Sequence, residues 1–313
     1  MILTDYFRSE HDLSWDYAVQ CGVTHGVIRL PEDAAFDITN SSHWETVYQR
    51  FRSCDITPVV IEPLPNSLHD HIKTGDALRD ASIEKVLKMF PLMERFGIPV
   101  LCFNFMAYVG WTRTGIIPDR GGALVTEFDE RKYEPSRYQI SEEQLWDNYT
   151  YFIRAVIPEA ERHGIRLALH PDDPPLAKLG NVSRILVSAK NIERAVYHIV
   201  ESENLGITFC QATFAMMGEN LDILIPRLRD KIFFIHFRNV RGDKHHFQET
   251  FHDNGMLDMC HLVDLYQQNH LDVPIRVDHV PTMAGEQVRN QGYDLLGRLY
   301  AIGYLKGVLG YSV

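Results

Sequence analysis

Four residues of metal-binding type stand at the ends of four short apolar segments in the second half of the chain. They are His170 after IRLAL, Cys210 after LGITF, His236 after IFFI and Asp278 after PIRV. A lone buried histidine or cysteine usually belongs to the core, but a carboxylate at the end of an apolar strand is costly to bury unless it is paired or metal-bound. If the segments are neighbouring strands of a parallel barrel, their C-terminal ends converge on one face. The four residues therefore predict a metal site on that face.

The ligand types leave the metal open. Thiolate and imidazole favour zinc or ferrous iron, whereas the carboxylate is also suited to manganese. Four protein ligands leave room for a substrate only if the coordination expands to five or six, which manganese and iron accept more readily than structural zinc.

An alternation of apolar runs with amphipathic stretches predicts how these residues are positioned. Besides the four segments above, strands are expected at 2–7, 24–30, 57–63 and 99–105. The spacing of apolar residues and the terminal glycines predict helices over 79–97 and 141–164, and shorter ones near 14–21, 43–53, 190–201, 218–229, 257–269 and 293–307. Eight strand–helix units predict an α/β protein, a (β/α)8 TIM barrel that forms a single domain over 1–313. The long connections 106–140, 171–189 and 239–256 all follow strands, so we expect them on the C-terminal face.

Composition restricts the classes of partner. The 313 residues are 45% hydrophobic, and a formal net charge of -11 argues against binding to nucleic acid or to an anionic membrane. No apolar run approaches the roughly 20 residues that span a bilayer, and the first residues do not resemble a signal peptide. Five scattered cysteines do not form a disulfide pattern. A cytoplasmic protein is expected.

Other polar residues surround the predicted ligands. Asp172 and Asp173 follow His170 and could orient histidine ligands, or could form a solvated acidic turn. An arginine after His236 could hold a substrate carboxylate by two parallel hydrogen bonds. His279 reaches the site only if its strand has ended, because successive strand residues point to opposite faces. The remaining candidates for substrate contact or for simple packing are Asn104, Trp111, Arg113, Arg238, Asn239, His252, Asp253 and Tyr293.

Several of these segments together resemble the mannonate dehydratase family. The segments are FNFMAYVGWTRT, ALHPDDPP, IHFRNV, FQETFHDNGMLDM, RVDH and GYDLLGRLYAIGYLKG, and the resemblance runs from about residue 57 to the C-terminus. It implies a barrel of the xylose-isomerase-like type, a divalent metal that is usually manganese, and dehydration of D-mannonate to 2-keto-3-deoxy-D-gluconate in hexuronate breakdown. The implied metal ligands are His170, Cys210, His236 and Asp278, and the implied catalytic residues are His279 and Tyr293. Family members tend to be homodimers.

The chain departs from the family pattern in its first third. TDYFRSEHD replaces an aromatic-Tyr-Gly sequence after the first strand, and IRLPEDAAFDITN replaces a histidine-containing turn after the second. Gly110 stands where an aspartate usually precedes the tryptophan, and QATFAMMG replaces a small turn after Cys210. Two alternatives therefore stay open beside the dehydratase: a metal-dependent sugar isomerase or epimerase, and a barrel that binds a sugar acid without turnover.

Overall fold

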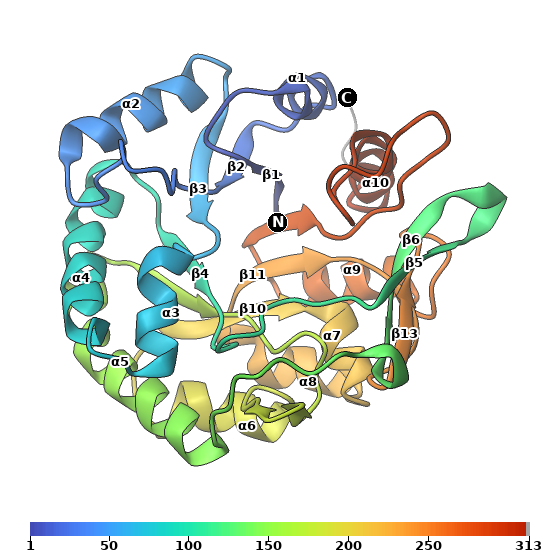
Figure 1. The fold of residues 1–313 in the computed structure, drawn as a ribbon. Coiled ribbons are helices and arrows are strands. Elements are labelled where there is room, and N and C mark those ends of the chain that lie inside the picture. The colour runs from blue at the N-terminus through green and yellow to red at the C-terminus, as the bar shows by residue number, and fades with distance from the viewer. Residues whose placement is uncertain (311–313) are drawn as a thin grey trace.

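A closed barrel of eight parallel strands forms the centre of the molecule (Figure 1). The computed structural model describes residues 1–310. Around the barrel the order is β1-β14-β11-β10-β7-β4-β3-β2, so the first and last strands of the chain close it. The strands are β1 (Ile2–Phe7), β2 (His25–Ile28), β3 (Thr57–Ile61), β4 (Val100–Phe103), β7 (Arg166–Leu169), β10 (Leu205–Cys210), β11 (Ile232–Phe237) and β14 (Pro274–Val277). The predicted (β/α)8 barrel is confirmed.

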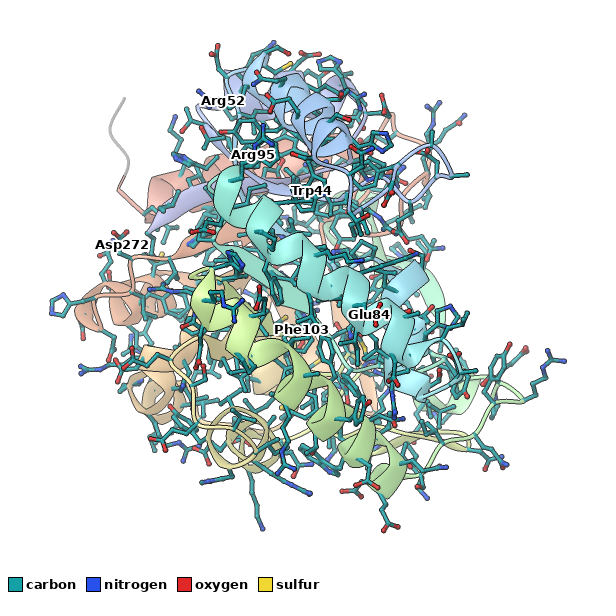
Figure 2. All side chains as sticks on the ribbon, turned by 90° about the vertical axis from the view of Figure 1, so that its left-hand side faces the viewer. Trp44, Arg52, Glu84, Arg95, Phe103 and Asp272 are labelled. Carbon is teal, nitrogen blue, oxygen red and sulfur yellow. The ribbon has the colours of Figure 1, made fainter. Side chains whose placement is uncertain are left out.

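Helices surround the barrel and cover its strands (Figures 1 and 2). Figure 2 shows α4 and α5 side by side on the outside, with Glu84 of α4 directed to solvent. The helices are α1 (Leu13–Gln20), α2 (Ser41–Arg52), α3 (Asn66–Thr74), α4 (Arg79–Arg95), α5 (Glu142–Arg162), α6 (Ala189–Glu193), α7 (Gln211–Met216), α8 (Leu221–Leu228), α9 (Met259–Gln268) and α10 (Leu295–Val308). A π-helical turn, Arg194–His198, continues α6, and 3-10 turns occupy Arg120–Gly122, Glu130–Lys132 and Arg229–Lys231. Of these helices, α3 and α7 were not predicted from the sequence.

Local chemistry sets the ends of the longest helix, α5. Ser141 Oγ accepts a hydrogen bond from the backbone N–H of Gln144 (3.1 Å), and the Gln144 side chain accepts one from the Ser141 N–H (2.9 Å). This reciprocal pair satisfies two N–H groups that the first turn leaves free. The chain leaves the helix at Gly164, whose φ of 64° is the left-handed conformation that favours glycine.

Two layers of apolar side chains stabilise the barrel. The larger lies between the strands and the helices and includes Trp15, which stacks on Phe51 with ring centroids 4.1 Å apart. A smaller cluster fills the inside of the barrel: Val27, Val60, Val100, Cys102, Ala168, Phe233 and Phe234. The barrel interior is thus largely packed with apolar side chains, although the buried Thr208 hydroxyl also lies there, 3.1 Å from Cys102 Sγ.

Two of the long connections build a second sheet. The first connection supplies strands β5 (Gly115–Pro118) and β6 (Leu124–Asp129). The third supplies β12 (Val240–Asp243) and β13 (His246–Glu249). They pair in the antiparallel order β12-β13-β6-β5. The second connection contributes the short pair β8 (Lys178–Leu179) and β9 (Val182–Ser183). The sequence predicted three long connections on one face but not the sheet they form.

No helix within residues 1–310 is long and apolar enough to cross a membrane.

Candidate metal centre and active site

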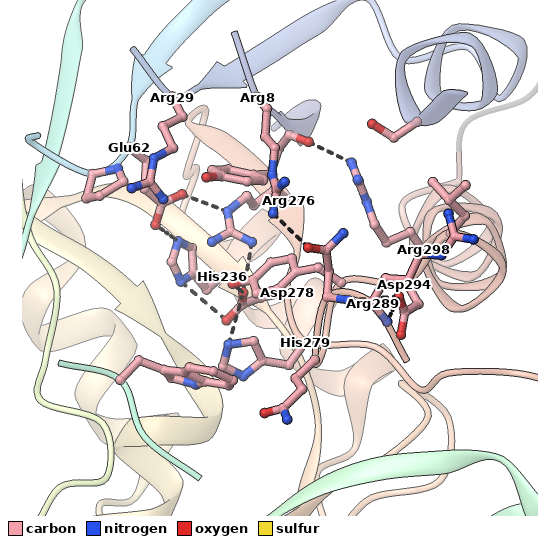
Figure 3. A pocket seen from close by; sticks show the side chains of 18 of the residues that line it. Arg8, Arg29, Glu62, His236, Arg276, Asp278, His279, Arg289, Asp294 and Arg298 are labelled. Carbon is pink, nitrogen blue, oxygen red and sulfur yellow. Dashed lines mark hydrogen bonds and ion pairs between the residues drawn. The ribbon is translucent and has the colours of Figure 1, made fainter. Parts of the chain in front are cut away.

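A cavity of about 1020 Å³ opens at the C-terminal ends of the barrel strands (Figure 3). Side chains in or just after seven of the barrel strands line it, among them Glu62 after β3, Asn104 after β4, His170 after β7, His236 near the end of β11 and Asp278 after β14. Convergence of strand ends at this face is the general property of the fold on which the sequence prediction rested.

Three of the four predicted metal ligands meet at one point. The potential ligand atoms of His170, Cys210 and His236 all lie within 4.8 Å of one another. Register explains the meeting, because Cys210 pairs directly with His236 across β10 and β11. His170 Nε2 lies 3.2 Å from His236 Nδ1, a separation at which both nitrogens can bind a single ion.

Each imidazole is oriented by its other nitrogen. Nδ1–H of His170 donates to the carbonyl of Pro171 (2.6 Å), which leaves the lone pair of Nε2 directed at the cluster. Burial lowers the pKa of His170, so the ring is neutral, as a metal ligand must be. His236 Nε2 lies 2.9 Å from Glu62 Oε1, and this carboxylate favours the tautomer with the proton on Nε2 and the lone pair on Nδ1.

The thiol of Cys210 is fully buried, and the groups around it favour its ionised form. Burial raises its pKa, but the guanidinium of Arg238 and a hydrogen bond with His236 outweigh that effect, and the pKa is lowered from its ordinary value. Arg238 Nε lies 3.3 Å from the sulfur, and the Thr213 hydroxyl donates to it at 3.1 Å. A thiolate is the form that binds metal.

Asp278, the fourth predicted ligand, lies at the edge of the cluster. Its Oδ2 is 3.6 Å from His236 Nδ1 and 3.3 Å from Arg238 Nε. Its Oδ1 accepts hydrogen bonds from Arg276 (2.9 Å) and from the hydroxyl of Tyr293 (2.8 Å). Burial raises the pKa of Asp278, but electrostatic interactions, with His279 and Arg276 first among them, hold it well below the usual value. Two imidazoles, a thiolate and a carboxylate fit a divalent transition-metal ion.

His279 and Tyr293 lie beside Asp278. β14 ends at Val277, and His279 has a φ of 28°, so the chain turns and brings both Asp278 and His279 to the cavity. Nδ1–H of His279 donates to Glu249 Oε1 (2.9 Å), while its Nε2 lies 3.7 Å from Asp278 Oδ1. The ring of His279 is perpendicular to that of Tyr293, with centroids 5.4 Å apart.

A network of buried ion pairs surrounds Glu249, the residue that accepts the hydrogen bond from His279. Asp173 accepts hydrogen bonds from Arg113 (2.8 and 3.0 Å) and from Arg238 (2.6 Å), and Arg238 also donates to Glu249 (2.6 Å). Burial raises the pKa of Glu249, but Arg238, His279 and Arg113 together lower it to about 2. Glu249 is therefore ionised and keeps a proton on Nδ1 of His279.

The predicted substrate-binding residues divide into three groups. Asn104 and Trp111 line the cavity, and the Trp111 ring lies 4.8 Å from that of His279. Arg113 and Arg238 are instead in the buried network just described, with side chains 1% and 0% exposed. Asp173 and Glu249 therefore bind the guanidinium groups that were expected to bind a substrate carboxylate.

Asn239 and His252 do not line the cavity. Their side chains form hydrogen bonds that stabilise the third connection. The Asn239 amide donates to the carbonyls of His252 and Leu257 (both 3.0 Å). His252 Nε2–H donates to the carbonyl of Phe237 (2.8 Å). Asp253 pairs with Arg120 (2.8 Å), and Asp172 accepts from the N–H of Leu186 (2.9 Å).

Sequence reasoning missed three charged residues of the site: Glu62, Glu249 and Arg276. Arg276 donates to both Glu62 (2.8 Å) and Asp278 (2.9 Å) and is 2% exposed. For two of them the sequence carried a signal. Arg276 lies inside the apolar segment PIRV and Glu62 ends the segment VVIE, and a charge in such a position needs a buried partner.

The fold and the cluster define the class as a (β/α)8 barrel with a candidate metal centre at its strand ends. The model of the D-mannonate dehydratase (UxuA) family matches residues 2–139 and 132–311. The chain belongs to this family of hydro-lyases. It is 32% identical to the mannonate dehydratase of Streptococcus agalactiae serotype III (strain NEM316) over 316 residues, which covers 88% of this chain and 89% of the relative.

Solved structures of other proteins share this fold. The crystal structure of mannonate dehydratase from Streptococcus suis serotype 2 superimposes with a TM-score of 0.88 at 28% identity, and covers 99% of this chain and 92% of that one. A structure of L-ribulose 3-epimerase has a TM-score of 0.63 at 14% identity over 98% of this chain and 94% of that one, a similarity of fold alone. The family match extends into the first third of the chain, where the sequence motifs were not visible.

Proposed function

We propose that this protein is a metal-dependent dehydratase that converts D-mannonate to 2-keto-3-deoxy-D-gluconate and water. The observation that carries the proposal is the placement of His279 and Tyr293 against the same oxygen of Asp278, next to the cluster of His170, Cys210 and His236, in one cavity. The proposed cellular setting is hexuronate breakdown in the cytoplasm, with a small sugar acid as substrate and a homodimer as the working form.

We assign the metal ion to His170, Cys210, His236 and Asp278, with manganese as the first choice and Fe²⁺ or Zn²⁺ as alternatives. A divalent ion bound there supplies Lewis-acid chemistry that increases the acidity of the hydrogen next to the substrate carboxylate. Two protein groups must then move protons, one from C2 and one to the departing C3 hydroxyl.

The surroundings of His279 and Tyr293 favour different roles for them. Glu249 holds a proton on Nδ1 of His279, so its Nε2 is free to accept the C2 proton. Burial first, and then the charge of Asp278, raise the pKa of Tyr293 well above its usual value, so its hydroxyl stays protonated and can donate. We propose His279 as the base and Tyr293 as the acid that protonates the C3 hydroxyl.

The test begins with elemental analysis of the purified protein and a panel of hexonates assayed with the metal found. We expect D-mannonate to yield 2-keto-3-deoxy-D-gluconate. His279→Gln and Tyr293→Phe should each lower kcat by about 10²- to 10⁴-fold with metal content unchanged. Tyr151→Phe, at an exposed tyrosine of α5, is the matched control.

Failure of every hexonate to form a 2-keto-3-deoxy acid would refute the dehydratase. In deuterated water, exchange at C2 without loss of water would favour the isomerase alternative. Ligand-induced thermal stabilisation without any turnover would favour a sugar-acid-binding protein.

A further inference from the structure

The outer wall of the cavity carries arginines that the proposed dehydration does not use. Arg8 follows β1, Arg29 follows β2, and Arg289 lies in the segment before α10; all three line the cavity. Figure 3 shows Arg8 and Arg29 on the side of the pocket across from His279. Arg8 and Arg29 lie in the two segments, TDYFRSEHD and IRLPEDAAFDITN, where the chain departs from the family pattern.

Backbone and side-chain contacts hold these three segments together. The N–H of Arg29 donates to the carbonyl of Phe7 (2.9 Å), which places the residues after β1 and β2 next to each other on the rim. The Arg8 guanidinium donates to the side-chain carbonyl of Asn290 (2.7 Å), the residue after Arg289. Arg8 is thus flanked by Arg29 on one side and by Arg289 on the other.

The positive charge of this wall is largely uncompensated. Within residues 1–310 neither Arg8 nor Arg289 forms an ion pair, and Asn290 is a neutral partner that leaves the charge of Arg8 intact. Only Arg29 has a carboxylate, Glu32, 3.0 Å from its Nε. The deeper cavity arginines differ, since Arg276 pairs with Glu62 and Asp278, and Arg298 pairs with Asp5.

The carboxylates near the mouth are engaged with backbone groups. Asp294 accepts from the hydroxyl of Thr282 and from the N–H groups of Arg289 (3.3 Å) and Asn290 (3.1 Å). Glu286 accepts from the N–H groups of Met283 (2.9 Å) and Leu296 (2.8 Å). Asp12 caps α1 through the N–H of Ser14 (2.8 Å). In a chain of net charge -11, three arginines of which only Arg29 is paired with a carboxylate form a local anion-binding surface.

We propose that Arg8, Arg29 and Arg289 form a distal anion subsite, and that the preferred substrate carries a second anionic group at the end of its carbon chain far from the carboxylate that reacts. The inference rests on the proposed dehydratase for the position of that reacting end. Guanidinium groups bind carboxylates and phosphates through two parallel hydrogen bonds. D-Mannonate has an uncharged alcohol at its far end, whereas a hexarate has a carboxylate there and a 6-phosphohexonate has a phosphate.

The experiment compares D-mannonate, D-mannarate and D-mannonate 6-phosphate on the intact, metal-loaded protein. The readouts are kcat/KM for 2-keto-3-deoxy acid formation and the thermal shift caused by each compound. We expect at least one of the two dianions to exceed D-mannonate by about tenfold in kcat/KM and to stabilise the protein more, with the advantage falling as salt rises. The two dianions distinguish a carboxylate from a phosphate as the recognised group.

The variant for this test is Arg8→Gln combined with Arg289→Gln. It should lower kcat/KM for the preferred dianion about tenfold more than for D-mannonate, and abolish the extra thermal shift. Arg154→Gln, at an exposed arginine of α5, is the matched control and should change neither readout. The proposal is overturned if D-mannonate equals both dianions in both readouts, or if the double variant affects all three compounds equally.

Failure of the dehydratase is distinguishable from failure of the subsite. If no compound is dehydrated, the proposed function is refuted. The subsite is then still supported by a thermal shift that is larger for a dianion and lost in the double variant, and overturned when that difference is absent.

Discussion

The Glu62 carboxylate follows β3 and contacts a candidate metal ligand, His236, on the opposite side of the barrel. Its Oε1 lies 2.9 Å from Nε2 of His236, and its Oε2 accepts from Arg276 (2.8 Å). Burial raises the pKa of Glu62, but Arg276 and His236 outweigh burial and lower it, so the group is ionised. A charged acceptor at this point keeps the proton of His236 on Nε2 and its lone pair on Nδ1.

Replacement of Glu62 by Gln should weaken metal binding while the barrel stays folded. Loss of the charge removes the preference for the Nε2–H tautomer of His236, and such changes behind a ligand typically weaken metal affinity by about 10- to 100-fold. Titration of the metal-free protein with Mn²⁺, with circular dichroism as the check of fold, measures the effect. Glu84→Gln on the exposed face of α4 is the control; equal affinities in Glu62→Gln and Glu84→Gln would remove Glu62 from this role.

His252 predicts a pH dependence of stability. Burial, the largest effect, lowers its pKa to about 4 despite the carbonyl of Phe237 that accepts its Nε2–H. The unfolded chain, with a histidine pKa of about 6.5, binds the extra proton between these values, so stability is lost as the pH falls from about 6.5 to about 4. The loss from this residue is at most roughly 3 kcal/mol.

Urea unfolding of the wild type and of His252→Gln across this range measures the contribution. The variant should show a smaller decrease in unfolding free energy between pH 6.5 and pH 4, because glutamine does not titrate. His245→Gln, at a histidine whose side chain is 57% exposed, should follow the wild type. Parallel curves for the wild type and His252→Gln would contradict the assignment.

At the scale of elements, the sheet of β12, β13, β6 and β5 joins two connections that are distant in the sequence. β13 ends at Glu249, the acceptor for His279, while the first connection supplies Arg113 to the same network. Neither a strand-end motif nor a helix pattern contains this information. The position of His279 therefore depends on pairing between residues 115–129 and 240–249.

Gly242 offers a test of that dependence. Its φ is 116°, and a Cβ added there would collide with the carbonyl oxygen of His246 and the backbone of Phe247. Gly242→Ala should destabilise the β12–β13 hairpin by roughly 1 to 3 kcal/mol and lower kcat by displacing Glu249. Gly303→Ala in α10, where a Cβ meets nothing within 4 Å, should be neutral or stabilise by up to about 1 kcal/mol. Unchanged stability and kcat in Gly242→Ala would show that the hairpin does not position Glu249.

At the scale of the whole molecule, the candidate metal site links four neighbouring strands, β7, β10, β11 and β14. A ligand that binds only the folded state stabilises it by mass action, by about 2.7 kcal/mol at a free concentration one hundred times Kd. Mn²⁺ should therefore raise the Tm of the metal-free protein, and a chelator should reverse the change.

Cys210→Ser should lose most of this stabilisation and most of the bound metal, because serine does not provide a thiolate. Cys260→Ser, at an exposed cysteine, is the control and should keep both. A Cys210→Ser protein with full metal content and full activity would exclude Cys210 as a ligand.

The sequence by itself determined the barrel and the set of candidate ligands. Alternating apolar runs and amphipathic stretches carry the local periodicities of strands and helices, and the four strand-end residues follow from position along those runs. Because parallel strands align their C-terminal ends, no further information was needed to expect His170, Cys210 and His236 together.

Only the tertiary structure decided which residues face the cavity and which lie behind it. Arg113 and Arg238 have the right chemistry to hold a substrate, but Asp173 and Glu249 occupy them, and that pairing joins segments far apart in the chain. Arg8, Arg29 and Arg289 carry no sequence signal and become neighbours only where β1, β2 and the segment before α10 meet. Such long-range pairings depend on barrel closure and loop packing, which local periodicity does not encode.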